Sequence, residues 1–143
     1  MEAEKNKAVV ARFYEEAWNK KNLSVIDETH APDYELGRLQ PWRKHGAEGL
    51  KEFIADNHRM FPDVHINIDD LIGEGDKVAM RMSATATHKG DLVGPVGLVK
   101  ATNKKVNWYG IFIFQLKEYK IVKAWGVTDN MDLMQQLGAV KKP

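Results

Sequence analysis

Long segments in which apolar and polar residues alternate are the strongest constraint on how this chain can fold. Over residues 77–88 the apolar side chains Val78, Met80, Met82 and Ala84 fall at every second position. Successive side chains of a strand point to opposite faces, so this period predicts a long β-strand with one buried face. The same alternation predicts further strands over 64–69, 106–116 and 120–127.

The first third of the chain has helical periodicity instead. Phe13, Tyr14, Ala17 and Trp18 recur at the spacing that puts side chains on one face of a helix. Ser24, with Asp27 three residues later, predicts a capped helix over 24–30. The remaining segments are predicted as a loop over 37–44, a helix over 47–60, a loop over 89–105 and a final helix over 131–137 that ends at Gly138.

Helices followed by an antiparallel meander are typical of an α+β domain with helices against one face of a sheet. A sheet of long, twisted strands curls, and helices over its hollow side enclose a cavity. We therefore expect a cone, in which a curved antiparallel sheet wraps around helices and leaves one apolar pocket. The chain has 143 residues and no repeat or linker, so a single domain over 1–143 is expected.

The composition argues against several classes of function. Without cysteine, the chain can form neither a disulfide nor a thiolate metal site. The five histidines show no i,i+4 helical pair and no grouping with a carboxylate, and we expect no metal and no other cofactor. Basic and acidic residues are interleaved at a net charge of +1, whereas nucleic-acid binding needs a concentrated positive surface.

The same sequence gives no sign of a membrane or an export route. No apolar run approaches the roughly 20 residues that a membrane-spanning helix needs. The charged N-terminal segment lacks the apolar stretch of a secretory signal. We expect a cytoplasmic protein with no membrane partner.

A series of segments follows in a fixed order along nearly the whole chain: HGAEGL (45–50), MFPD (60–63), EGDKVA (74–79), THKG (87–90), WYGIFIF (108–114), KIV (120–122) and the stretch 125–138. In this order and spacing they resemble the SnoaL-like group of the NTF2-like superfamily. The resemblance implies the cone described above and a hydrophobic small molecule as partner. Known members include polyketide cyclases, which close a ring by intramolecular aldol condensation without metal or organic cofactor. In these cyclases an aspartate is the general acid/base. Relatives usually form homodimers through the open sheet.

Two positions depart from the cyclase pattern. The cyclase aspartate lies in the last strand, just after the position of Trp125, where this chain has Gly126. A histidine of the preceding strand aligns with Phe112. Alternation places Gly126 and Phe112 on matching faces of adjacent strands, so both polar positions are replaced in this chain. The cyclase mechanism therefore does not carry over unchanged.

Two titratable side chains remain as catalytic candidates. Asp129 follows the last strand and could act as a general base beside an apolar cavity, or it could cap the helix that begins near Met131. His88 ends the strand that begins at residue 77. It could relay a proton or hold a substrate carbonyl, or it could simply bond a loop carbonyl beside Gly90.

Aromatic residues are the candidates for binding a flat ligand. The resemblance places Trp18 and Phe53 at positions that contact substrate in the cyclases. The full set of expected substrate-binding residues is Tyr14, Trp18, Phe53, Trp108, Tyr109, Phe112 and Trp125. Ile111 and Ile113 lie on the face opposite Phe112, and their exposure in a monomer predicts a homodimer.

Three hypotheses about function follow. The first is a cofactor-independent enzyme of the cyclase, isomerase or lyase type, which abstracts a proton next to the carbonyl of a hydrophobic compound. Asp129 would be its base, with His88 or Tyr109 donating to the oxyanion. The second is a non-catalytic binding or accessory protein, which the presence of Gly126 and Phe112 favours. The third is a related cofactor-free hydrolase or hydroxylase.

Overall fold

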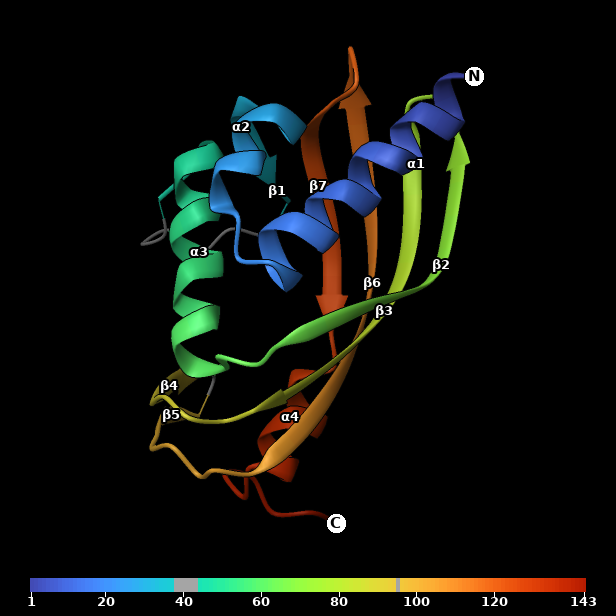
Figure 1. Ribbon diagram of the computed structural model, residues 1–143. Coiled ribbons are helices and arrows are strands. Elements are labelled where there is room, and N and C mark those ends of the chain that lie inside the picture. Colours follow the sequence, from blue (N-terminus) through green and yellow to red (C-terminus); the bar gives the residue numbers. More distant parts are fainter. Residues whose placement is uncertain (38–43, 95) are drawn as a thin grey trace.

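The computed structural model describes residues 1–37, 44–94 and 96–143 (Figure 1). It confirms the α+β class. The helical elements are α1 (Glu2–Phe13), a π-helix η1 (Tyr14–Asn19), a 3₁₀ turn η2 (Leu23–Val25), α2 (Ile26–Thr29), α3 (Gly46–Met60) and α4 (Asn130–Gln136). The strands are β1 (His30–Leu36), β2 (His65–Glu74), β3 (Lys77–Thr87), β4 (Leu92–Gly94), β5 (Gly97–Val99), β6 (Lys105–Lys117) and β7 (Lys120–Thr128).

The main sheet has five strands in the order β1-β7-β6-β3-β2, and only β1 and β7 are parallel. The predicted antiparallel sheet is thus present, with one parallel pair at its β1 edge. Strand β1 was not predicted, because its sequence does not alternate and it contains Pro32. Proline is tolerated there because β1 is an edge strand. The helix expected over 24–30 ends at Thr29, and Ser24 bonds the Asn22 side chain at 2.6 Å instead of capping.

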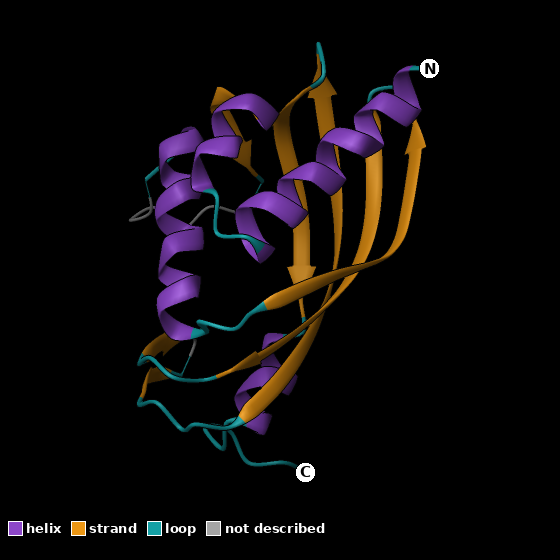
Figure 2. Cartoon of the chain, in the orientation of Figure 1, coloured by secondary structure: helices purple, strands orange, loops and turns teal. Residues whose placement is uncertain are grey.

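Helices α1 and α3 lie against one face of the curved sheet, as Figure 2 shows, and this helix-covered face holds the core. The predicted alternation of β3 is confirmed, since Val78, Met80, Met82 and Ala84 are all buried. The opposite, open face carries exposed apolar side chains: Ile72, Tyr109, Ile111, Ile113, Trp125 and Val127. Within the described residues no helix is both long and apolar enough to cross a bilayer.

Two side-chain amides complete sheet edges where no strand is available. Asn19, at the end of η1, accepts from the backbone N–H of Ile66 at 2.7 Å and donates to its carbonyl at 3.0 Å. The side chain of Gln136 in α4 likewise accepts from the backbone N–H of Asn107 at 3.0 Å and donates to its carbonyl at 2.7 Å. Each amide reproduces the donor and acceptor of a missing strand, so edge backbone groups stay paired. These bonds fix η1 and α4 to the sheet.

The segment predicted as a loop over 89–105 contains a small hairpin, formed by β4 and β5. It leaves the main sheet after β3 and returns at β6, beside the C-terminal end of α3 (Figure 1). Gly90 makes this contact possible, because a Cβ there would lie 2.6 Å from the carbonyl oxygen of Arg59. The predicted loop over 37–44 falls mostly on residues 38–43, which lie outside the described residues.

Candidate functional site

Gly126 and Phe112, the two positions at which the resemblance predicted a departure from the cyclases, meet on the helix-covered face. Phe112 of β6 is the register partner of Gly126 of β7 on one side and of Met80 of β3 on the other. A Cβ at Gly126 would overlap ring atoms Cδ1 and Cε1 of Phe112 and would lie 2.9 Å from Cγ. At Gly110 a Cβ would lie 2.8 Å from Cε2 of the same ring. The Phe112 ring therefore occupies the space above two glycines.

This arrangement has a direct chemical consequence. Any side chain at 126 would require the Phe112 ring to move, because its first carbon would lie inside the ring's van der Waals envelope. The position that the resemblance assigns to the cyclase acid/base would thus be filled by an apolar ring. Phe112 is half-buried and stacks on Phe114 with 6.2 Å between ring centroids. The two rings form an apolar surface on this part of the sheet.

Trp18 and Phe53 face one another from η1 and α3. Their ring centroids are 6.4 Å apart in an edge-to-face arrangement, and both side chains are half-buried against the core. The backbone oxygen of Trp18 lies 2.9 Å from Nε2 of His58, which fixes η1 to α3. π-helical turns of this kind occur often at functional sites. The segment also carries Tyr14, which is buried.

Trp108, Tyr109 and Trp125 divide between the two faces. Trp108 is buried on the helix-covered face, 5.0 Å from Phe61 between ring centroids. Tyr109 and Trp125 lie on the open face and are 52% and 39% exposed. The Trp125 ring packs under the ammonium of Lys123 at 5.1 Å. This placement corrects the expectation that Tyr109 and Trp125 line the inner cavity, and strand alternation is the physical reason.

Asp129 is the N-cap of α4. Its Oδ1 accepts from the backbone N–H of Asp132 at 3.0 Å, and its own N–H donates to the carbonyl of Tyr109 at 3.0 Å. The residue is exposed. Of the two alternatives from sequence, the cap is the contact that the structure contains. One carboxylate oxygen remains without a hydrogen bond to any described residue.

His88 is fully buried, at 0% exposure, where the β4–β5 hairpin leaves the sheet. Its Nδ1 accepts from the backbone N–H of Thr102 at 3.2 Å, so the neutral ring carries its proton on Nε2. Backbone bonds to Lys104 and Asn103, both 2.9 Å, hold the same residue. Burial lowers the pKa of the imidazole below its usual range. A backbone hydrogen bond with Gly90 partly offsets this shift, which matches the alternative in which His88 bonds the loop beside Gly90. His88 is therefore a neutral donor.

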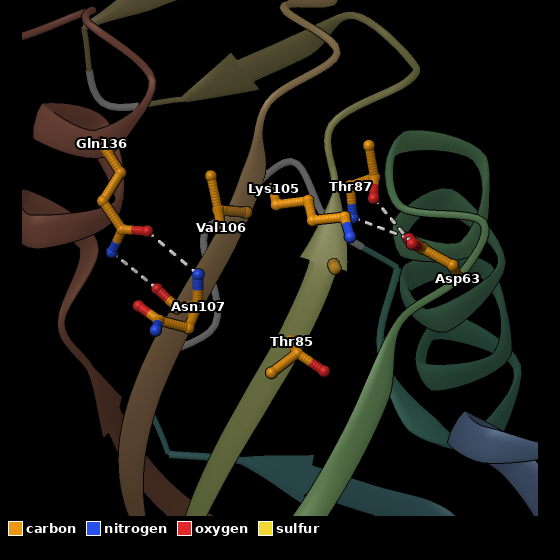
Figure 3. Close-up of a pocket in the computed structure, with 8 residues that line it drawn as sticks. Asp63, Thr85, Thr87, Lys105, Val106, Asn107 and Gln136 are labelled. Atoms are coloured by element: carbon orange, nitrogen blue, oxygen red, sulfur yellow. Dashed lines mark hydrogen bonds between the residues drawn. The ribbon is translucent and has the colours of Figure 1, made fainter.

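A groove of about 360 Å³ lies at the ends of β3 and β6, beside α4 (Figure 3). Several of its polar groups already form hydrogen bonds within the protein. Asp63 accepts from the backbone N–H and the hydroxyl of Thr87, at 2.6 and 2.7 Å, and Gln136 pairs with Asn107 as described above. Of the expected site residues, none lines this groove. Among the described residues no group of His, Asp or Glu side chains could hold a metal ion.

The fold and its apolar inner face define a class of protein: an NTF2-like α+β domain with aromatic side chains on the helix-covered face of its sheet. Comparison with known protein families narrows this class to one family. The family model for SnoaL-like polyketide cyclases matches residues 8–137, and the chain belongs to this family.

Solved structures agree with this assignment. A candidate polyketide cyclase from Bacillus cereus is 31% identical, with a TM-score of 0.80 over 95% of this chain and 82% of that one. A candidate hydroxylase, AclR from Streptomyces galilaeus, is 25% identical, with a TM-score of 0.82 over 99% and 85% of the two chains. TsrD from Streptomyces laurentii has a TM-score of 0.87 over 98% and 99% at 24% identity, which shows the shared fold. A comparison with curated proteins gave no match.

Proposed function

We propose that this protein binds a hydrophobic, flat carbonyl compound of polyketide type on the helix-covered face of its sheet, without the acid/base chemistry of the cyclases. The observation that carries the proposal is the Phe112 ring above Gly126. A single glycine at 126 would only remove the catalytic carboxylate. A phenyl ring fitted into the resulting space converts the position into an apolar contact for a ligand.

The aromatic side chains around it support the same reading. Trp18, Phe53 and Phe112 are half-buried, so they pack on the core and retain exposed ring surface. Aromatic rings gain both apolar burial and favourable ring geometry when they contact another flat ring system. Family membership implies a small-molecule substrate, and flat polycyclic ketones match these side chains in shape and polarity.

The proposal is tested by calorimetric titration with a tricyclic aromatic ketone such as anthrone. We expect binding to the unaltered protein and a loss of at least about tenfold in affinity for Trp18→Ala or Phe53→Ala, because each removes a large apolar contact. Trp125→Ala is the matched control, since this tryptophan lies on the open face. Equal losses for Trp18→Ala and Trp125→Ala would contradict the proposed site.

A second candidate is an enzyme that abstracts a proton next to a carbonyl. One observation favours it: Asp129 keeps an unbonded carboxylate oxygen just past Gly126. In that reaction the Asp129 carboxylate would take the proton, and an N–H donor would stabilise the enolate oxygen. The substitution Asp129→Asn separates this candidate from the binding function, because it keeps the cap and removes the base.

We also propose that two copies of the chain pair through the open face. The exposed side chains of Tyr109, Ile111, Ile113 and Val127 form one apolar surface on adjacent strands. Monomeric proteins rarely expose contiguous apolar patches of this kind. A second copy would remove this surface from water, and its formation is measured by sedimentation.

A further inference from the structure

The polar groove at the ends of β3 and β6 lies on the open face of the sheet, away from the helix-covered face. Its volume is about 360 Å³, and its floor is the last part of β3 paired with the first part of β6 (Figure 3). The side chains of Thr85, Thr87, Lys105 and Asn107 project to this face, because the residues between them in each strand are buried. The groove is thus separate from the proposed hydrophobic site.

The walls of the groove stand where the neighbouring strands stop. Strand β2 begins only at His65, and the backbone N–H of Thr87 donates to the Asp63 carboxylate at 2.6 Å. Strand β7 ends short of the other edge, where the Gln136 side chain bonds the backbone of Asn107. Both walls are therefore held to the floor by hydrogen bonds, which makes the groove a fixed part of the fold.

Three polar groups of the groove have no partner among the described residues: the ammonium of Lys105, the hydroxyl of Thr85 and the side-chain amide of Asn107. Thr85 is the register partner of Asn107, and Thr87 is that of Lys105. Opposite side chains of an antiparallel pair have Cβ atoms about 4.5–5.5 Å apart, and rows two residues apart are separated by about 7 Å. One small molecule can therefore reach all three groups.

The charges of the groove favour an anion. Asp63 accepts one hydrogen bond at each carboxylate oxygen, from the N–H and the hydroxyl of Thr87 at 2.6 and 2.7 Å. Burial alone would raise the pKa of Asp63, but these bonds and the charge of Lys89 lower the pKa overall, so the carboxylate stays ionised beside a lysine. The ammonium of Lys105 is left without a counter-charge among the described residues.

We infer that this groove binds a small hydroxycarboxylate. The carboxylate contacts the Lys105 ammonium and accepts from Thr85 and Asn107, and the hydroxyl donates to an unused lone pair of Asp63. The volume is near the lower end of small-molecule sites, which span about 300–1,000 Å³, so the ligand is compact. Because the groove and the hydrophobic site lie on opposite faces of the sheet, this inference does not rest on the proposed function.

The test compares lactate with propane-1,2-diol, which has a hydroxymethyl group in place of the carboxylate. Each compound is titrated into isotope-labelled protein, and the amide resonances of Thr87 and Asn107 are followed by NMR. We expect lactate to shift these amides in a saturable way and the diol to bind at least about fivefold more weakly. A charge pair about 4 Å apart in water contributes about fivefold in affinity, and the diol lacks the negative charge.

Variants assign this preference to the groove. Lys105→Gln should weaken lactate binding at least about fivefold, whereas Lys105→Arg keeps the charge and should retain binding. Thr85→Val removes a hydroxyl at nearly constant volume and should weaken binding about two- to tenfold. Lys77→Gln is the matched control, since Lys77 is an exposed lysine on the same face at the other end of β3. The altered side chains are all exposed, so the variants should fold, and their melting temperatures check this.

The outcomes are separate from those of the proposed function. An absence of shifts, shifts that do not saturate, or equal binding of lactate and propane-1,2-diol would overturn the inference. Equal losses for Lys105→Gln and Lys77→Gln would also overturn it, because the lactate would then respond to surface charge in general. Each of these results would leave the hydrophobic site in place, since anthrone binding is measured independently.

Discussion

The contact between Gly126 and Phe112 predicts a strong coupling between these two positions. Gly126→Ala adds one methyl group where Cδ1 and Cε1 of Phe112 lie, so the ring or the strand must shift. Overpacking of this kind costs about 1–3 kcal/mol. An unfolding entropy of about 2.1 cal/mol/K per residue turns this cost into a fall in melting temperature of about 3–10 °C for a chain of 143 residues.

The same substitution behaves differently once the ring is absent. In a Phe112→Ala background the new methyl group has no ring to meet. Gly126→Ala should then be neutral or stabilise the protein by up to about 1 kcal/mol, because alanine restricts the unfolded chain more than glycine does. The double-mutant cycle should therefore give an interaction energy of about 1–4 kcal/mol.

Thermal and urea unfolding of the four proteins measures this energy. Urea unfolding reports whether the slope, and thus the exposed surface, stays constant across the set. Additivity within about 0.5 kcal/mol would refute the reasoning, since it would mean that the ring does not occupy the space above Gly126. It would also remove the observation on which the proposed function rests.

Four further outcomes are expected. Burial depresses the pKa of His30 from 6.5 to about 3, so the stability that this group contributes is fully present above pH 6.5. That stability falls as the pH drops toward 3, by at most about 1.4 kcal/mol per pH unit. His30→Phe should flatten this slope when melting temperatures are measured against pH. Asp129→Asn should leave the melting temperature within about 2 °C, whereas Asp129→Ala should lower it by about 3 °C, because only the first keeps the cap. If the second candidate function holds, Asp129→Asn should also lower turnover about 100- to 10,000-fold. Ile111→Lys should convert a sedimenting dimer to a monomer, and a monomeric unaltered protein at micromolar concentration would contradict the dimer. Zinc and chelators should leave the melting temperature unchanged, and a zinc-dependent rise that a chelator reverses would show a metal site.

The periodic parts of the sequence determined most of the architecture. The alternation through β3 and β6 is a local property of the chain, and it correctly assigned Trp108 and Phe112 to one face and Ile111 to the other. The helix expected over 47–60 is α3, and the final helix is α4 with Gly138 at a positive φ of 77° just beyond it. The hydrophobic period and the turn residues depend only on residues close together in the sequence, so these strands and helices can be predicted without knowledge of the fold.

Other features depended on contacts between distant segments. Strand β1 exists because its backbone pairs with β7, with His30 opposite Ile121, and nothing in its own sequence alternates. The hairpin β4–β5 likewise depends on pairing between its two short strands, and the sequence predicts only a loop there. Trp125 was expected inside because of its aromatic character, but the register of β7 places it on the open face.

The resemblance predicted that Gly126 and Phe112 stand at the two polar positions of the cyclases, and alternation placed them on matching faces of adjacent strands, which the register confirms. Only the tertiary structure showed that the Phe112 ring lies over Gly126, because register and rotamer together decide which side chain fills a given space. His30, Tyr14 and Tyr34 come from separate elements, and no spacing in the sequence brings them together. Their burial, and the unpaired Nε2 of His30, arise from packing between helices, a strand and the sheet, which is a property of the folded chain and not of any one segment.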